Sequence, residues 1–185
     1  MRVLGVSGSL RRESHNRRLL WAAASLLPPE AELVPFEGLK AIPPFDEDDE
    51  ATPPPEVQEW RAAIDLADAV LFATPEYNSS IPGQLKNALD WASRKKADSV
   101  LRNKPVAVVG ASKSMFGALW AQAELRKVLA SAGARVLDAE LAVATAHEAF
   151  DDDALIDADL SQALAAIVAD LVEMARERAD AVSRV

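Results

Sequence analysis

The first sixteen residues place a polar, glycine-containing loop between a short apolar segment and a helical pattern. Val3, Leu4 and Val6 form an apolar run too short for a helix, which indicates a strand buried on both faces. Gly8 ends that run, and after Asn16 apolar residues recur at helical spacing. A strand, a polar loop and a helix in this order direct free backbone N–H groups and the positive end of the helix dipole toward an anion. The sequence therefore predicts either an anion site at this loop or an ordinary βα loop with incidental serines.

Side chains of the loop are needed if that anion is a phosphate. A helix terminus contributes roughly 0.3–1 kcal/mol toward an anion, whereas micromolar binding requires about 8 kcal/mol. Hydrogen bonds to charged groups, at roughly 1.5–3 kcal/mol each, would supply the difference. The loop offers such donors at Ser9, Arg11, Ser14 and Asn16. It matches neither the Walker A motif, which needs Gly-Lys-Ser/Thr, nor the dinucleotide fingerprint G-x-G-x-x-G.

Size and charge limit the classes of protein to which the chain can belong. With 185 residues, half of them hydrophobic, residues 1–185 are expected to form a single domain with a full core. The net charge of −9 argues against nucleic acid and against an anionic membrane surface as partners. The absence of cysteine excludes disulfides and thiol catalysis. The chain opens on its first strand and contains no apolar run of about 18 residues, so we expect a cytoplasmic protein.

Strand and helix patterns alternate along the rest of the chain. Further strands are expected at 31–35, 68–73, 105–110 and 136–141. Helices are expected near 57–67, 85–92, 125–132 and 156–171, with Gly133 ending the fourth helix. Five strands alternating with five helices indicate an α/β fold with a doubly wound five-stranded parallel sheet and helices on both faces. We predict the flavodoxin-like strand order 2-1-3-4-5.

Three loops that follow strand ends carry unusual chemistry, at 8–16, 75–83 and 111–117. In the predicted strand order these loops lie side by side, where ligands of doubly wound sheets bind. Pro75, Glu76, Tyr77 and Asn78 either border a flat heteroaromatic ligand or form a plain turn. The third loop, which includes Ser112, would add backbone donors.

The first and second loops together resemble the NADPH-dependent FMN reductase family, which includes soluble quinone and chromate reductases and some azoreductases. The resemblance rests on Gly8-Ser9-Leu10-Arg11 with Ser14 and Asn16, on Pro75-Glu76-Tyr77-Asn78, and on Gly83, Leu85, Lys86, Asn87, Ala88, Asp90 and Trp91. It runs from Val3 to about Phe150. It implies an FMN phosphate surrounded by Ser9, Arg11, Ser14 and Asn16, with His15 nearby. It also implies an isoalloxazine ring bordered by Pro75, Glu76, Tyr77 and Asn78, chiefly through main chain, with Ser112 in the third loop.

The resemblance further implies NADPH or NADH as co-substrate and a small-molecule electron acceptor such as a quinone. Because the chain shows no second nucleotide-binding unit, we expect nicotinamide and acceptor to exchange in a ping-pong manner at one surface. No catalytic side chain and no metal ligand are predicted. Family members are commonly dimers or tetramers, so a homodimer or homotetramer is expected, with Trp91 or Trp120 as candidate anchors. The chain departs from the family in the third loop, at Lys113-Ser114-Met115 and Trp120, and at Ser79.

Two other functions fit the same pattern. A flavodoxin-like one-electron carrier would suit the acidic surface but would not oxidise NAD(P)H directly. A flavin-free regulatory or scaffold domain would have the same fold but would bind no flavin. Two further features are interpreted as structural: the pair His147–Glu148, and the acidic run 46–50 as a solvated surface loop.

Overall fold

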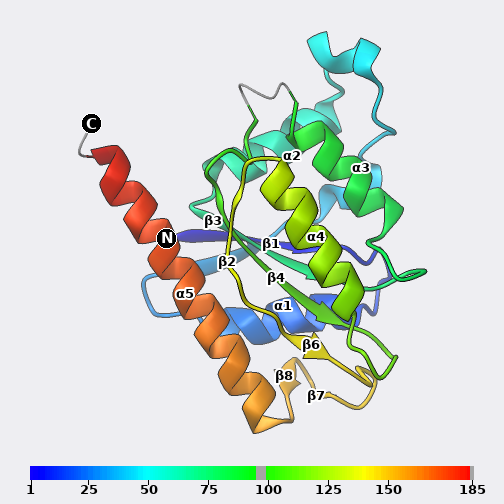
Figure 1. Cartoon of the computed structure of the whole chain (residues 1–185), viewed down its shortest axis with the longest axis vertical. Helices are drawn as coiled ribbons and strands as arrows, with labels where there is room; N and C mark the ends of the chain where they lie inside the picture. Colours follow the sequence, from blue (N-terminus) through cyan, green and yellow to red (C-terminus); the bar gives the residue numbers. More distant parts are fainter. Residues whose placement is uncertain (95–98, 184–185) are drawn as a thin grey trace.

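A parallel sheet forms the centre of the computed structural model, which describes residues 1–94 and 99–183. Its strand order is β2-β1-β3-β4-β5, which confirms the predicted flavodoxin-like topology (Figure 1). Every pairing in this order is parallel. The strands are β1 (Arg2–Ser7), β2 (Glu32–Pro35), β3 (Ala69–Thr74), β4 (Pro105–Ala111) and β5 (Arg135–Val136).

Helices cover both faces of this sheet, as predicted. One face packs against α2 (Pro55–Leu66), α3 (Gly83–Ala92) and α4 (Leu119–Ser131), and the other against α1 (His15–Leu26) and α5 (Ala158–Ser183). Side chains of β3 alternate between the two cores: Val70 and Phe72 lie with the first group of helices, and Leu71 with the second. This alternation, in strands buried on both faces, explains their continuous apolar sequences. No helix within 1–94 or 99–183 has the length and apolar character needed to cross a membrane.

The proline-rich segment between β2 and α2 runs over the surface and contains two short 3-10 helices, η1 (Gly38–Ala41) and η2 (Glu47–Ala51). No residue of the acidic η2 is buried, in agreement with the predicted solvated loop. The segment is held to α3 at Pro43, whose carbonyl accepts hydrogen bonds from Trp91 Nε1 at 3.0 Å and Asn87 Nδ2 at 2.8 Å. Trp91 is buried in the core, so the expectation that it could anchor an oligomer is wrong.

The predicted continuous strand at 136–141 is wrong, because the chain pairs with β4 at two separate places. After β5 it leaves the sheet and returns as β6 (Ala142–Val143), which also pairs with β4. Side chains of α4 bind the backbone of the excursion: Arg126 Nη1 donates to Ala139 O at 3.3 Å, and Gln122 Oε1 accepts from Leu141 N at 3.3 Å. These contacts satisfy backbone groups that would otherwise be paired within a strand. The apolar pattern alone cannot distinguish the two arrangements.

A small antiparallel hairpin that was not predicted, β7 (Phe150–Asp151) with β8 (Ala154–Leu155), precedes the last helix. The helical pattern assigned from Ile156 onward starts too early, because Asp157 caps α5 by accepting from the N–H of Asp159 and Leu160 at 2.8 and 3.1 Å. Ile156 therefore lies outside the helix and is 64% exposed. The predicted helix end at Gly133 is confirmed, since its φ of +92° is the left-handed conformation typical of that position.

Candidate cofactor site

The loops after β1, β3 and β4 meet at the carboxyl ends of these strands and line one cavity. It contains nine of the ten predicted site residues: Ser9, Arg11, Ser14, His15, Asn16, Pro75, Glu76, Tyr77 and Ser112. Ala111 and Lys113 complete its lining. Asn78, the tenth, lies beside Tyr77 in the turn that follows. The three loops therefore form one site, as the strand order predicts.

The first loop is shaped by the start of α1. Gly8 N donates to Ala73 O at 2.8 Å, which extends the pairing of β1 with β3 by one residue. Ser14 caps α1: its Oγ accepts from Asn16 N at 3.2 Å and Arg17 N at 3.3 Å. These bonds use only the oxygen as acceptor, so the Ser14 hydroxyl has one proton to donate, either to Ser7 Oγ at 3.5 Å or to a ligand.

The side chain of Asn16 braces two loops against each other. Its Nδ2 donates to Ala111 O and its Oδ1 accepts from Ala111 N, both at 2.9 Å. The residue is buried. The oxygen and one N–H of the amide are therefore engaged with the end of β4, and the second N–H of Nδ2 has no partner there.

His15 lies in an unusual electrostatic setting at the cavity. Neither ring nitrogen has a hydrogen-bond partner within the described residues, although both are buried. The ring stacks on Phe150, with centroids 6.5 Å apart and planes at 10°. Burial lowers the pKa of His15, and the positive charges of Arg11, Lys113, Arg18 and His147 lower it further. In a chain of net charge −9, this concentration of cations favours an anionic ligand.

The second loop is a tight turn. Tyr77 and Ser80 exchange backbone hydrogen bonds of 3.0 and 3.1 Å, and the residues between them, Asn78 and Ser79, both have positive φ. These features describe a type I′ turn, a conformation that asparagine tolerates well. The turn leaves Tyr77 half exposed at the cavity. Its neighbour Glu76 accepts a hydrogen bond from Ala121 N at 3.1 Å and so ties the second loop to α4.

The third loop presents large apolar side chains next to the cavity-lining residues Ser112 and Lys113. Ser112 Oγ donates to Ser114 Oγ and accepts from Ser114 N, both at 3.1 Å, which fixes the turn. Beyond it Met115, Phe116 and Trp120 are exposed by 75, 48 and 46%. The rings of Phe116 and Trp120 contact each other, with centroids 4.8 Å apart.

Sequence reasoning did not identify Phe150 and Arg18 as parts of this region. Phe150 reaches His15 only because the β7–β8 hairpin folds over α1. Arg18 lies over the Phe150 ring at 5.0 Å and donates from Nε to Asp152 O at 2.7 Å. The pair His147–Glu148, read as structural, is an exposed contact of 3.4 Å. Among the described residues no cluster of carboxylates, histidines or cysteines could hold a metal ion.

The residues present fit the phosphate of a flavin mononucleotide. Arg11 and Lys113 supply positive charge, the Ser14 hydroxyl supplies a donor, and the free ring nitrogens of His15 accept or donate a proton according to the ligand. The exposed ring of Tyr77 supplies apolar surface for a flat heterocycle.

Comparison with known proteins agrees with this geometry. A family model described as NADPH-dependent FMN reductase matches residues 1–148. The chain is 43% identical over 153 residues to an NAD(P)H-dependent FMN reductase of Pseudomonas aeruginosa, covering 82% of each chain. It is 44% identical over 128 residues to a quinone reductase of Pseudomonas putida, covering 69% of this chain and 68% of the relative.

A solved structure supports the same assignment. The flavoenzyme FerB of Paracoccus denitrificans, an NAD(P)H:(acceptor) oxidoreductase, superposes with a TM-score of 0.83 at 31% identity, covering 95% of this chain and 97% of its own. The match of the family model over most of the chain, together with these relatives, shows that the protein belongs to the NADPH-dependent FMN reductase family.

Proposed function

We propose that the protein binds FMN and acts as an NAD(P)H oxidoreductase that passes electrons from reduced nicotinamide to quinones or similar small acceptors. The observation that carries the proposal is His15, which lines the cofactor cavity with Arg11 and Lys113 and whose two ring nitrogens have no hydrogen-bond partner within the described residues. A buried polar group without a partner is costly unless a ligand satisfies it. Membership of the FMN reductase family supplies the identity of that ligand.

Each loop has a separate task in this proposal. Ser9, Arg11, Ser14 and His15 hold the phosphate, and Asn16 keeps their loop in place through Ala111. The main chain of 75–78 borders the ring, while Ser112 and the N-terminus of α4 place partial positive charge beside it. When bound, FMN supplies the redox chemistry by taking hydride from the nicotinamide and passing electrons to the acceptor. The protein binds, orients and excludes water, and no side chain acts as acid or base.

The exposed residues of the third loop favour a flat, apolar acceptor. Met115, Phe116 and Trp120 are exposed and follow the cavity-lining Lys113 in the chain, and the half-exposed Tyr77 lines the cavity from the second loop. Aromatic rings of this kind bind other flat rings through their faces. Nicotinamide and quinone would occupy this surface in turn, which predicts ping-pong kinetics.

The same residues support the proposal of a homodimer or homotetramer. Exposed aromatic side chains are enriched at the centres of protein interfaces. With Trp91 buried, Trp120 and Phe116 are the candidate anchors. Sedimentation velocity at micromolar concentration tests this proposal: the wild type should sediment as an oligomer and Trp120→Asp as a smaller species. A monomeric wild type would contradict it.

The decisive experiment reconstitutes the purified protein with FMN and follows the oxidation of NADPH and of NADH with 1,4-benzoquinone as acceptor. We expect a yellow protein, turnover with at least one coenzyme, and parallel lines in double-reciprocal plots. Protein that takes up FMN but does not oxidise either coenzyme would point to the one-electron carrier instead. Colourless protein that fails to take up FMN would point to a scaffold.

A further inference from the structure

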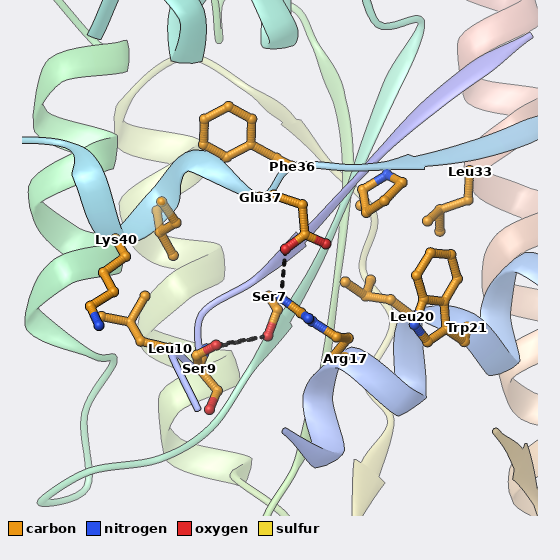
Figure 2. Close-up of a pocket in the computed structure, with 13 residues that line it drawn as sticks. Ser7, Ser9, Leu10, Arg17, Leu20, Trp21, Leu33, Phe36, Glu37 and Lys40 are labelled. Atoms are coloured by element: carbon orange, nitrogen blue, oxygen red, sulfur yellow. Dashed lines mark hydrogen bonds and ion pairs between the residues drawn. The ribbon is translucent and has the colours of Figure 1, made fainter. Parts of the chain in front are cut away.

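A second cavity lies next to the first loop and shares Ser9 with the cofactor site; Figure 2 shows its lining. It is enclosed by the ends of β1 and β2, the first turns of α1 and the 3-10 helix η1. Its volume is about 160 Å³, and its wall is divided between polar groups and apolar side chains, the latter from Leu10, Leu20, Trp21, Leu33, Phe36 and Leu39. An engineered protein cavity of about 150 Å³ with a wholly apolar lining binds benzene, so a volume of this size is sufficient for one ring. The space therefore suits one aromatic ring.

The charged groups at this second cavity do not cancel. Arg17 and Glu37 form an ion pair of 2.6 Å that links α1 to the segment after β2, so each neutralises the other. Figure 2 shows this pair between Lys40 on one side and Trp21 on the other. Lys40 makes no ion pair with any residue of 1–94 or 99–183, although the chain as a whole is strongly acidic. One uncompensated positive charge thus borders a cavity whose wall is partly apolar.

We propose that this second cavity binds a small aromatic acid, namely a single ring that carries a carboxylate. The ring would lie among Leu10, Phe36 and Leu39, and the carboxylate would meet the ammonium group of Lys40. Apolar walls alone would accept any small ring, and a surface lysine alone would attract any anion. Their combination selects a molecule that has both features.

The second cavity shares a wall with the cofactor site. Ser9 lines both cavities. Its backbone is held by Ser7, whose Oγ accepts from Ser9 N and donates to Ser9 O, both at 3.3 Å. A ligand in the second cavity would therefore contact the same loop that lines the cofactor site. Any effect it has on FMN affinity must be matched by an equal effect of FMN on its own affinity.

The test uses the full-length apoprotein and three probes: benzoate, benzyl alcohol as a neutral ring, and acetate as an anion without a ring. Isothermal titration calorimetry should give a Kd of about 1 mM or below for benzoate, weaker binding of benzyl alcohol, and none for acetate. Lys40→Met should weaken benzoate about fivefold and leave benzyl alcohol unchanged. Lys127→Met, which removes an exposed lysine at a distant position on α4, is the matched control. It should change the affinity for neither benzoate nor benzyl alcohol.

A cavity-filling variant tests the location. Leu33 lines the second cavity and is partly exposed, so Leu33→Trp should fill the space and abolish binding of both ring probes, with folding checked by circular dichroism and thermal melting. Equal binding of benzoate and benzyl alcohol, no effect of Lys40→Met, or full binding by folded Leu33→Trp would each overturn the proposal. Because these titrations contain no FMN, they succeed or fail independently of the proposed oxidoreductase function.

Discussion

The side-chain amide of Asn16 takes the place of a missing strand beside Ala111. β3 ends at Thr74, which pairs with Gly110, so Ala111 has no strand partner on that side. Asn16 supplies both missing hydrogen bonds, each of 2.9 Å, from the first turn of α1. The sheet edge on which the third loop begins is thus completed by a residue of the first loop.

Replacement of Asn16 by alanine should therefore destabilise the protein. Two buried backbone groups of Ala111 would lose their partners, at roughly 1–3 kcal/mol each, so we expect a loss of about 2–6 kcal/mol in the free energy of unfolding. Urea denaturation measures this loss. Ser25→Ala, on the same helix, is the matched control and should cost less than about 0.5 kcal/mol. A loss no larger than that of the control would show that the brace contributes little.

A second link between loops joins Glu76 to α4. The N-cap position of α4, Ala118, has a left-handed φ of +64° and provides no side-chain acceptor. The carboxylate of Glu76 fills this role by accepting from Ala121 N at 3.1 Å. Loss of a helix cap typically costs about 1 kcal/mol.

Glu76→Ala should accordingly lower the free energy of unfolding by about 1 kcal/mol and weaken FMN binding through movement of the second loop. Glu76→Gln retains a side-chain acceptor of the same length and should recover most of the stability. Urea denaturation and fluorescence titration with FMN measure the two effects. If Glu76→Gln is as unstable as Glu76→Ala, charge rather than the hydrogen bond is responsible.

His15 should make the apoprotein sensitive to acid. Burial, reinforced by nearby cations, lowers its pKa in the folded state below the ordinary value of 6.5. As the pH falls below 6.5, the unfolded chain binds a proton before the folded chain does, so stability is lost progressively with acidification. His15→Asn should remove this contribution and flatten the decline. His147→Asn changes the only other histidine, which is exposed, and should retain the decline of the wild type.

Urea midpoints measured at several pH values between neutral and mildly acid conditions provide the comparison. The same residue should respond to the cofactor, because a phosphate dianion favours the protonated ring. Binding of FMN to the wild-type apoprotein should then take up protons, detected calorimetrically in buffers of different ionisation enthalpy. Parallel stability curves for wild type and His15→Asn would contradict the assigned environment.

The buried amine of Lys104 should make the stability of the protein depend on pH in the alkaline range. Its Nζ donates to the carbonyls of Asp65 and Ala67, at 3.1 and 2.5 Å, and its side chain is almost fully buried. Burial lowers the pKa of Lys104 from 10.5 to about 8. Between these two values the unfolded chain holds a proton that the folded chain lacks, so stability should rise with pH.

Lys104→Met should abolish this alkaline rise, because methionine has a similar shape and no titratable group. The measurement is the urea midpoint at about pH 7 and about pH 9.5, compared between variant and wild type. Lys127→Met, at an exposed position, should keep the rise. Identical slopes for Lys104→Met and wild type would mean that Lys104 remains protonated throughout.

The sequence predicted those parts of the fold that depend on local apolar pattern. The strands at Val3–Val6 and 105–110 are buried on both faces, and continuous apolar runs of that length leave few alternatives. The fifth strand was predicted wrongly because its interruption depends on hydrogen bonds from the side chains of Arg126 and Gln122, which belong to the preceding helix α4. The start of α5 was missed because Asp157, rather than Ile156, decides where the helix begins.

The candidate site, like the fold, could be predicted from the sequence only in part. Its loops were located by the breaks in pattern at Gly8 and Pro75, because parallel strands bring their carboxyl ends together. The bracing role of Asn16 could not be predicted, since its partner is 95 residues away. The same holds for the stacking of Phe150 on His15, which depends on a hairpin whose fold the sequence does not indicate.

The phosphate assignment itself is tested by removing two donors of the first loop together. Ser9 and Arg11 both line the cofactor cavity, and Arg11 N lies 3.5 Å from Ser9 Oγ within the same turn. Loss of their charged hydrogen bonds should weaken FMN retention about tenfold or more in Ser9→Ala/Arg11→Ala. Fluorescence titration with FMN and with riboflavin, which lacks the phosphate, separates the two contributions: FMN affinity should fall toward that of riboflavin, and riboflavin affinity should not change.

Arg12→Ala is the control for general loss of positive charge, since Arg12 is exposed and does not line the cavity. It should reduce FMN affinity by less than about threefold, the range of a screened surface charge. If the double variant retains FMN as well as Arg12→Ala does, the phosphate is held elsewhere. The unpartnered nitrogens of His15 would then need another ligand, because the cations around them would still favour an anion at that place.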